Sequence, residues 1–242
     1  MSKLAMLGAI VVVALVLGSC SIYVPQTITG SGKVETVQED LSGFSKIDAS
    51  SAFQVSITQS EDYSVVITVD EKVVPYLDVT VQGDTLRIAV RPGLTLGIGA
   101  FPLNAKVSMP RLTGLELSGA TRTSITGFKS GENLDANVSG ASQLTGDVEA
   151  GNVRFGISGA SRMTLQGKGQ SMNLDASGAS QANLQDFQVG NADVQVSGAS
   201  RATVNATGKL NVDASGASQV RYGGSPALGT VKSSGSSSIQ PQ

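Results

Sequence analysis

The chain has 242 residues, a formal net charge of −2 at pH 7, and 29 glycines against an aromatic content of 4% with no tryptophan. This composition favours narrow units with small residues at tight corners over a wide aromatic core. The scattered lysines and arginines form no basic stripe, so nucleic acid is not expected as a partner.

The amino terminus has the pattern of a bacterial lipoprotein signal. Lys3 precedes an apolar and small-residue run from Leu4 to Leu17, which is short for a spanning helix of about 20 residues but normal for a secretory signal. The segment Leu17-Gly18-Ser19-Cys20 resembles a lipobox. This resemblance implies a signal peptide over residues 1–19 and lipidation of Cys20. The alternative is an ordinary signal that is cut at a nearby small residue.

Lipidation of Cys20 would anchor the protein in a bacterial cell envelope, with the membrane as its partner. Ser21 stands where inner-membrane retention usually shows aspartate, so by analogy the destination is the outer membrane. Residues 20–42 combine Pro25, Gly30 and Gly32 with polar residues, and we expect a tether there that leads to a first strand.

Residues 43–110 are expected to form a less regular β region that caps or widens one end of the fold. Strand-like runs lie at Phe53 to Thr58, Tyr63 to Asp70, Leu77 to Val81, Thr85 to Val90 and Ala105 to Met109. Gln82-Gly83-Asp84 predicts a hairpin turn between two of these runs. Ile47 to Ala52 has the alternation of the later repeats with Ser51 in place of a glycine, and we interpret it as a diverged first copy.

Residues 111–238 consist of a repeat whose centre reads Ser-Gly-Ala-Ser or a close variant every 18 to 21 residues. The expected structural corners are its glycines: Gly119, Gly140, Gly159, Gly178, Gly198 and Gly216, with a degraded copy around Gly235. Apolar or small residues lie four and two positions before each glycine, as in a strand with one buried face. Self-similarity at this period indicates one unit stacked on copies of itself.

The repeat therefore predicts an all-β protein, a right-handed parallel β-helix or β-solenoid with coils of about 19–20 residues. We expect the less regular β region at its amino-terminal end and a short tail over residues 239–242. Units of this length are too short for paired helices, which need about 33 residues, or for a propeller blade of about 40 residues, and they lack the leucine-rich repeat pattern.

Several segments resemble the head GIN domain family of auto-transporter adhesins. They are Gly30 to Val34, Ser42 to Ile47, Thr85 to Ile88, and Met109 to Leu112 leading into Leu117-Ser118-Gly119. The resemblance covers about residues 30–238. It implies a β-helix-like fold in secreted proteins and lipoproteins and a role in adhesion, and it brings no catalytic or binding residues with it.

The candidate contact surface is a row of outward side chains three positions after each glycine. Arginine and glutamine alternate strictly along it: Arg122, Gln143, Arg162, Gln181, Arg201 and Gln219. This contact ladder could bind an anionic or glycan surface. The alternative is structural, because adjacent arginines about 4.8 Å apart would repel each other, and alternation doubles that spacing.

Catalysis and metal binding are not expected, and the chain suggests no cofactor. The serines beside each glycine have no histidine base anywhere in the chain, so we assign them to corner geometry. Asp175 and Asp213 share one position three before their glycines, as does Asp48, but Gln195 separates the first two by about 10 Å, too far to share a Ca²⁺. A polysaccharide-active enzyme is the remote alternative, because such chemistry needs clustered carboxylates or a properly separated acid/base pair, and the most acidic groups, Glu39-Asp40 and Glu61-Asp62, have the pattern of solvated turn residues.

Two functions follow from the sequence. The first is a lipid-anchored adhesin or binding module whose polar side contacts envelope glycans or surface proteins. The second is a structural spacer or a self-assembling envelope component. The oligomeric state distinguishes the two functions, because a strictly monomeric rod would count against assembly.

Overall fold

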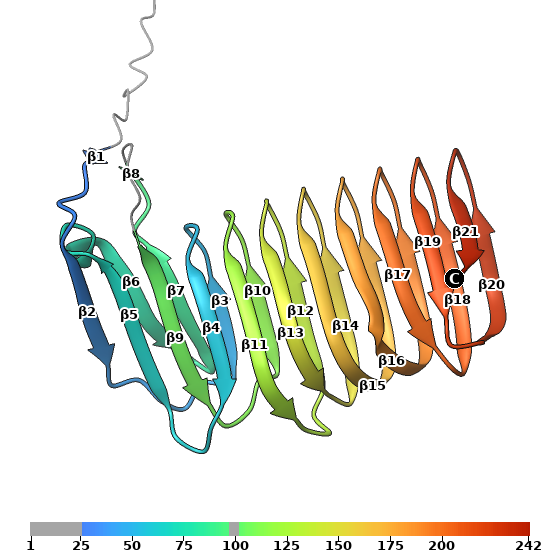
Figure 1. Ribbon diagram of the computed structural model, residues 1–242, viewed down its shortest axis with the longest axis horizontal. Helices are drawn as coiled ribbons and strands as arrows, with labels where there is room; N and C mark the ends of the chain where they lie inside the picture. Colours follow the sequence, from blue (N-terminus) through green and yellow to red (C-terminus); the bar gives the residue numbers. More distant parts are fainter. Residues whose placement is uncertain (1–25, 97–101) are drawn as a thin grey trace, which may run out of the picture.

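The computed structural model describes residues 26–96 and 102–242; the expected signal peptide (1–19) and Cys20 lie outside the described residues. Stacked β-strands form an elongated body, as predicted (Figure 1). The one helix among the described residues is η1 (Val74–Tyr76), a single 3-10 turn, and no helix there could cross a membrane.

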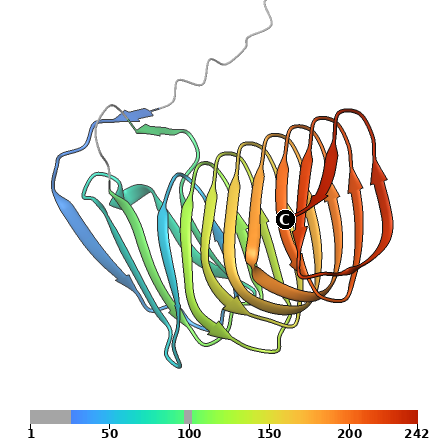
Figure 2. The same cartoon turned by 45° about the vertical axis from the view of Figure 1, so that its right-hand side comes forward.

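Each coil has one strand before the glycine corner and one after it. The strands before the corner form the pre-corner sheet, made of β3 (Lys46–Ala49), β10 (Gly114–Leu117), β12 (Leu134–Val138), β14 (Asn152–Ile157), the second halves of β15 (Arg162–Ala176) and β16 (Gln181–Val196), β18 (Lys209–Ala214) and β20 (Ala227–Ser233). The strands after the corner form the post-corner sheet, made of β4 (Gln54–Gln59), β11 (Arg122–Lys129), β13 (Gln143–Glu149), the first halves of β15 and β16, β17 (Arg201–Ala206), β19 (Gln219–Gly223) and β21 (Ser238–Pro241). The corners join the two sheets along one edge (Figure 2).

Neighbouring coils pair in parallel, and beside the corners they pair in register, which places equivalent residues in rows; the register shifts farther along β11, β15, β16 and β18. Leu115 pairs with Ala136, Ala136 with Phe155, and Phe155 with Leu174, and all four side chains are buried. Phe155 also meets Phe187 edge to face at 5.7 Å between ring centres. The alternation seen in the sequence thus becomes a continuous narrow core between the two sheets.

The corner glycines have positive φ angles between 69° and 76° in all six expected positions. The backbone bonds continue through the corner, since the N–H of Ala160 donates to the carbonyl of Gly140 at 2.8 Å. A Cβ atom on Gly159 would lie 2.4 Å from that same oxygen. Glycine is therefore required here both for the left-handed backbone and for the close approach of the preceding coil.

The diverged first copy is confirmed as a coil of the stack. Ile47 pairs with Leu115 and Ala49 with Leu117, so Ser51 takes the place of the corner glycine. Ser51 and Ala52 have positive φ angles of 62° and 64°. This corner is therefore built from residues that rarely adopt such a backbone.

The chain order differs from the spatial order at the amino-terminal end. β7 (Thr85–Val90) and β9 (Leu103–Met109) stack in parallel on β3 and β4, on the side away from β10 and β11. The first coil is thus enclosed between strands that follow it in the sequence. Antiparallel strands β5 (Ser64–Asp70) and β6 (Leu77–Gln82) then pair with β9 and β7, and the predicted hairpin at Gly83-Asp84 joins β6 to β7.

A tether was expected over residues 20–42, but the structure forms two strands in this range. β2 (Val34–Glu39) pairs antiparallel with β5, and β1 (Gln26–Ile28) pairs with β8 (Leu94–Leu96) in a separate two-stranded sheet. The pairing partner of β2 lies about thirty residues downstream, and no repeat in the sequence indicates it.

Asp70, at the end of β5, holds the segment that enters β2. Its carboxylate oxygens accept hydrogen bonds from the backbone N–H groups of Ser31, Gly32 and Lys72, with N···O distances of 2.9–3.0 Å. Burial alone would raise the pKa of Asp70, but these bonds to its charged form outweigh burial and hold the pKa below its usual value. The segment that enters β2 is thus fixed to the end of β5 by a satisfied buried carboxylate.

The carboxyl-terminal end is also more regular than expected. β21 pairs in parallel with β19 from Ser238 to Pro241, across most of the stretch predicted as a tail. The last coil closes through a corner at Gly235, whose φ is +70°.

Replacing Gly159 with alanine should lower the free energy of unfolding by about 2 kcal/mol or more, because alanine strains the left-handed backbone and collides with the Gly140 carbonyl. Urea unfolding measures this loss. The matched control is Gly131→Ala, where nothing lies within 4 Å of an added Cβ and the change should stay within about 0.5 kcal/mol. Equal effects at both positions would contradict the role given to the corner.

Candidate functional site

The post-corner sheet brings the whole contact ladder together in one row. Successive strands pair Arg122 with Gln143, then Arg162, Gln181, Arg201 and Gln219. Gln54 and Asn104 continue the row toward the cap. The row begins each post-corner strand, next to the corner, and all of its members project outward from the sheet.

The three arginines of the ladder are exposed, and the glutamines between them are half-buried. Arg162 donates from Nε to Oε1 of Gln181 at 3.2 Å. Over the described residues, none of the three arginines forms an ion pair with a carboxylate. Two coil steps of about 4.8 Å separate consecutive arginines, which keeps their mutual repulsion small.

The opposite sheet has an acidic row that sequence reasoning recognised only in part. The row consists of the residues three positions before each corner, which are neighbours in the strand register. From the cap onward they are Asp48, Glu116, Asn137, Gly156, Asp175, Gln195 and Asp213. Asp175 and Asp213 lie on either side of the coil with Gln195, as expected. Glu116 was missed because the comparison of repeats singled out aspartate alone, although its offset from the glycine is the same.

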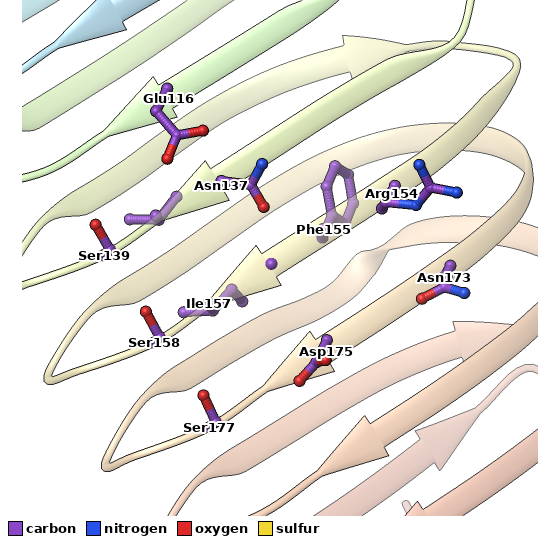
Figure 3. A pocket seen from close by; sticks show the side chains of 12 residues that line it. Glu116, Asn137, Ser139, Arg154, Phe155, Ile157, Ser158, Asn173, Asp175 and Ser177 are labelled. Atoms are coloured by element: carbon purple, nitrogen blue, oxygen red, sulfur yellow. The ribbon is translucent and has the colours of Figure 1, made fainter.

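The acidic row is interrupted by an open groove above Gly156, which has no side chain to fill the row. The groove has a volume of about 540 Å³, and Figure 3 shows Asn137 and Asp175 on its two sides. The serines Ser139, Ser158 and Ser177 line one edge, and Arg154 and Asn173 line the other. Arg154 lies 3.6 Å from Asp135, so its charge is compensated within the sheet.

Glu116 is the member of this row whose protonation is perturbed. Partial burial raises the pKa of its carboxyl, and the neighbouring charges of Asp48 and Asp135 raise it further, against a hydrogen bond with Asn137. Asp48 itself is paired with Arg87 at 2.8 Å, and Arg87 also binds Asp78 at 2.9 Å. The acids near the cap are thus partly neutralised, whereas Glu116, Asp175 and Asp213 have no ion-pair partner in the part of the chain that the structure describes.

The hydroxyls two positions after the six glycines are buried, and four of them, on Ser142, Ser180, Ser200 and Ser218, bond to neighbouring coils, whereas that of Thr121 bonds to its own corner and that of Ser161 has no partner. Ser142 accepts the N–H of Thr121 at 3.2 Å, Ser180 donates to the carbonyl of Ile157 at 3.3 Å, and Ser218 donates to that of Val196 at 3.2 Å. Within the described ranges, no group of three or more histidine, cysteine or acidic residues could hold a metal ion. The arrangement is suited to non-covalent binding by charge and hydrogen bonds.

The fold defines an elongated parallel β-solenoid with an antiparallel cap, a basic row on one face and an acidic row on the other. The family model described as "Putative auto-transporter adhesin, head GIN domain" matches residues 43–226, and the chain belongs to this family. The name of the family points to a location at the cell envelope or surface. No curated protein matches the chain.

Several solved structures share the fold, including three from Bacteroides and Parabacteroides species. A "putative adhesin" from Bacteroides fragilis aligns with a TM-score of 0.80 at 20% identity, over 89% of this chain and all of the other. A "Putative lipid binding protein" from Parabacteroides distasonis aligns with a TM-score of 0.70 at 19% identity, over 90% of this chain and all of the other. A "putative adhesin" from Parabacteroides merdae aligns with a TM-score of 0.67 at 18% identity, over 90% of this chain and 99% of the other.

Replacing Glu116 with glutamine should stabilise the fold at pH 7. The raised pKa means that the folded state favours the protonated carboxyl of Glu116 over the ionised one. The stability that protonated Glu116 contributes is therefore full below about pH 4 and is lost as pH rises through the folded pKa. The gain of the variant over the native protein should therefore vanish in acid. Urea midpoints from acid to neutral pH measure it, and a gain that grows toward acid would contradict this assignment.

Proposed function

We propose that the protein is a non-catalytic binding module of the cell envelope, and that the contact ladder is its adhesive surface. The observation that carries this proposal is the row of three exposed arginines without ion-pair partners among the described residues, held in register by the coil stack. Guanidinium groups bind carboxylates, sulfates and phosphates in a bidentate manner. The ligand class is therefore an anionic polymer, such as an acidic envelope glycan or an acidic protein surface.

The geometry supports a repeating ligand over a compact one. Consecutive arginines lie two coil steps apart, about 9.6 Å, and the half-buried glutamines between them add amide donors and acceptors. Each exposed contact is weak by itself, so adhesion through this row depends on several arginines binding the same polymer at once.

We also propose that Cys20 is lipidated and anchors the protein, with the outer membrane as its location. The support is the signal-like segment at residues 1–19 and the lipobox pattern before Cys20. In the sequence, the strands β1 and β2 of the cap come first after Cys20, and the regular coils follow them.

The combined variant Arg122→Gln, Arg162→Gln and Arg201→Gln should elute from a heparin matrix at a clearly lower salt concentration than the native chain, because it lacks the three arginine contacts. The matched control Lys33→Gln, Lys72→Gln and Arg91→Gln removes three exposed cations near the cap and should elute close to the native chain. If both variants lose the same retention, net charge and not the ladder governs binding.

Cys20→Ala should move the expressed protein from the membrane fraction to the soluble fraction, because the variant lacks the residue that would bear the lipid. Fractionation of cells followed by immunoblotting measures the partition, and Ser21→Ala serves as the control. Membrane association of Cys20→Ala equal to that of the native chain would show that the anchor is elsewhere.

A further inference from the structure

We propose that the anionic partner of the contact ladder is the acidic row of a second copy of this chain. This inference rests on the proposed function, since it names the partner of the same surface. It makes the adhesion homotypic: the post-corner face of one copy binds the pre-corner face of another.

The first argument is the separation of charge between the two faces. Close to the corner, the post-corner row has Arg122, Arg162 and Arg201 and no carboxylate, whereas the pre-corner row between β10 and β18 has Glu116, Asp175 and Asp213 and no cation. Within the described residues, none of these six side chains has an ion-pair partner of its own. Each face therefore presents charges that the other can neutralise.

The second argument is position along the coil. The arginine row lies three residues after the corner and the acidic row three residues before it, on the two sheets that the corner joins. When a second copy is placed beside the first without rotation, its arginine row meets the acidic row at the same distance from the corner edge.

The third argument is the common step. Both rows advance by one strand spacing, about 4.8 Å, per coil, so contacts formed at one coil repeat along the body. With the coils of both copies aligned, Arg122 faces Glu116, and Arg201 faces Gln195, which has Asp175 and Asp213 on its two sides. Arg162 then faces the groove above Gly156, the one place in the row without a side chain, with Asp175 on the next strand.

Most charges of the opposite sign lie farther from the corner. The two exceptions stand at the ends of the acidic row, where Arg87 is neutralised by Asp48 and Asp78 and where Lys232 follows Asp213. On the post-corner sheet, Asp147 and Asp186 line a shallow depression with Gln166, and Glu149 pairs with Lys168 at 3.0 Å. On the pre-corner sheet, Arg154 is compensated by Asp135.

The contact is heterologous, because different faces of the two copies meet, and a copy that binds through one face keeps the other face free. Association therefore continues into rows of copies. Single exposed ion pairs contribute little, so the interaction should be weak between free molecules and strong between surfaces that present many copies.

Aggregation of beads coated with the full chain through its amino terminus tests this proposal. Native beads should clump at about 10 mM salt and disperse at about 1 M salt, where charges are screened within a few ångströms. Beads with the ladder reversed, Arg122→Glu, Arg162→Glu and Arg201→Glu, should clump at least about tenfold less. Adding Glu116→Lys, Asp175→Lys and Asp213→Lys to the same chain should restore clumping, because each face again meets its opposite.

A balanced control separates facial complementarity from net charge. It combines the reversed ladder with Glu35→Lys, Glu61→Lys and Asp62→Lys, three exposed residues near the cap, and so keeps the native net charge while both faces are acidic at the corner. This variant should not clump. Clumping of the control, or native beads that stay dispersed at low salt, would overturn the inference. Native beads that stay dispersed while the native chain keeps its ladder-dependent retention on heparin would overturn the homotypic partner and leave the proposed function in place.

Discussion

Parallel, in-register backbone pairing between coils is the constraint on which the rest of the structure depends. One strand step fixes the distance between equivalent residues, so any choice made in one coil is repeated along a row. The corner shows this most directly, because the Gly159 backbone must approach the Gly140 carbonyl closely enough to continue the bond ladder. Inward apolar residues merge into one core for the same reason.

The repeated half of the fold could be predicted from the sequence because its information is local. A period near nineteen, a glycine with fixed neighbours and a two-residue alternation identify the coil, its corner and its buried face. The cap could not be predicted in the same way: the insertion of β7 and β9 beyond β3 and β4, and the pairing of β2 with β5, depend on contacts between strands that share no repeat.

The site was predicted unevenly for a related reason. Identical residue types in equivalent positions identified the arginine and glutamine row, which the structure places on one face. The opposing row mixes Glu116 with aspartates and interrupts them with Asn137, Gly156 and Gln195, so its common charge is visible only once the strands are in register. The groove above Gly156 likewise exists only because neighbouring coils supply its walls.

Deleting one whole coil, residues 162–180, tests this account most directly, since the deletion joins Ser161 to Gln181 and leaves each remaining strand with an equivalent neighbour. If stability comes from contacts between adjacent coils, the shortened chain should keep a β-type circular dichroism spectrum and unfold in urea in a single cooperative transition, at a somewhat lower midpoint. A shortened chain without a cooperative transition would contradict the account.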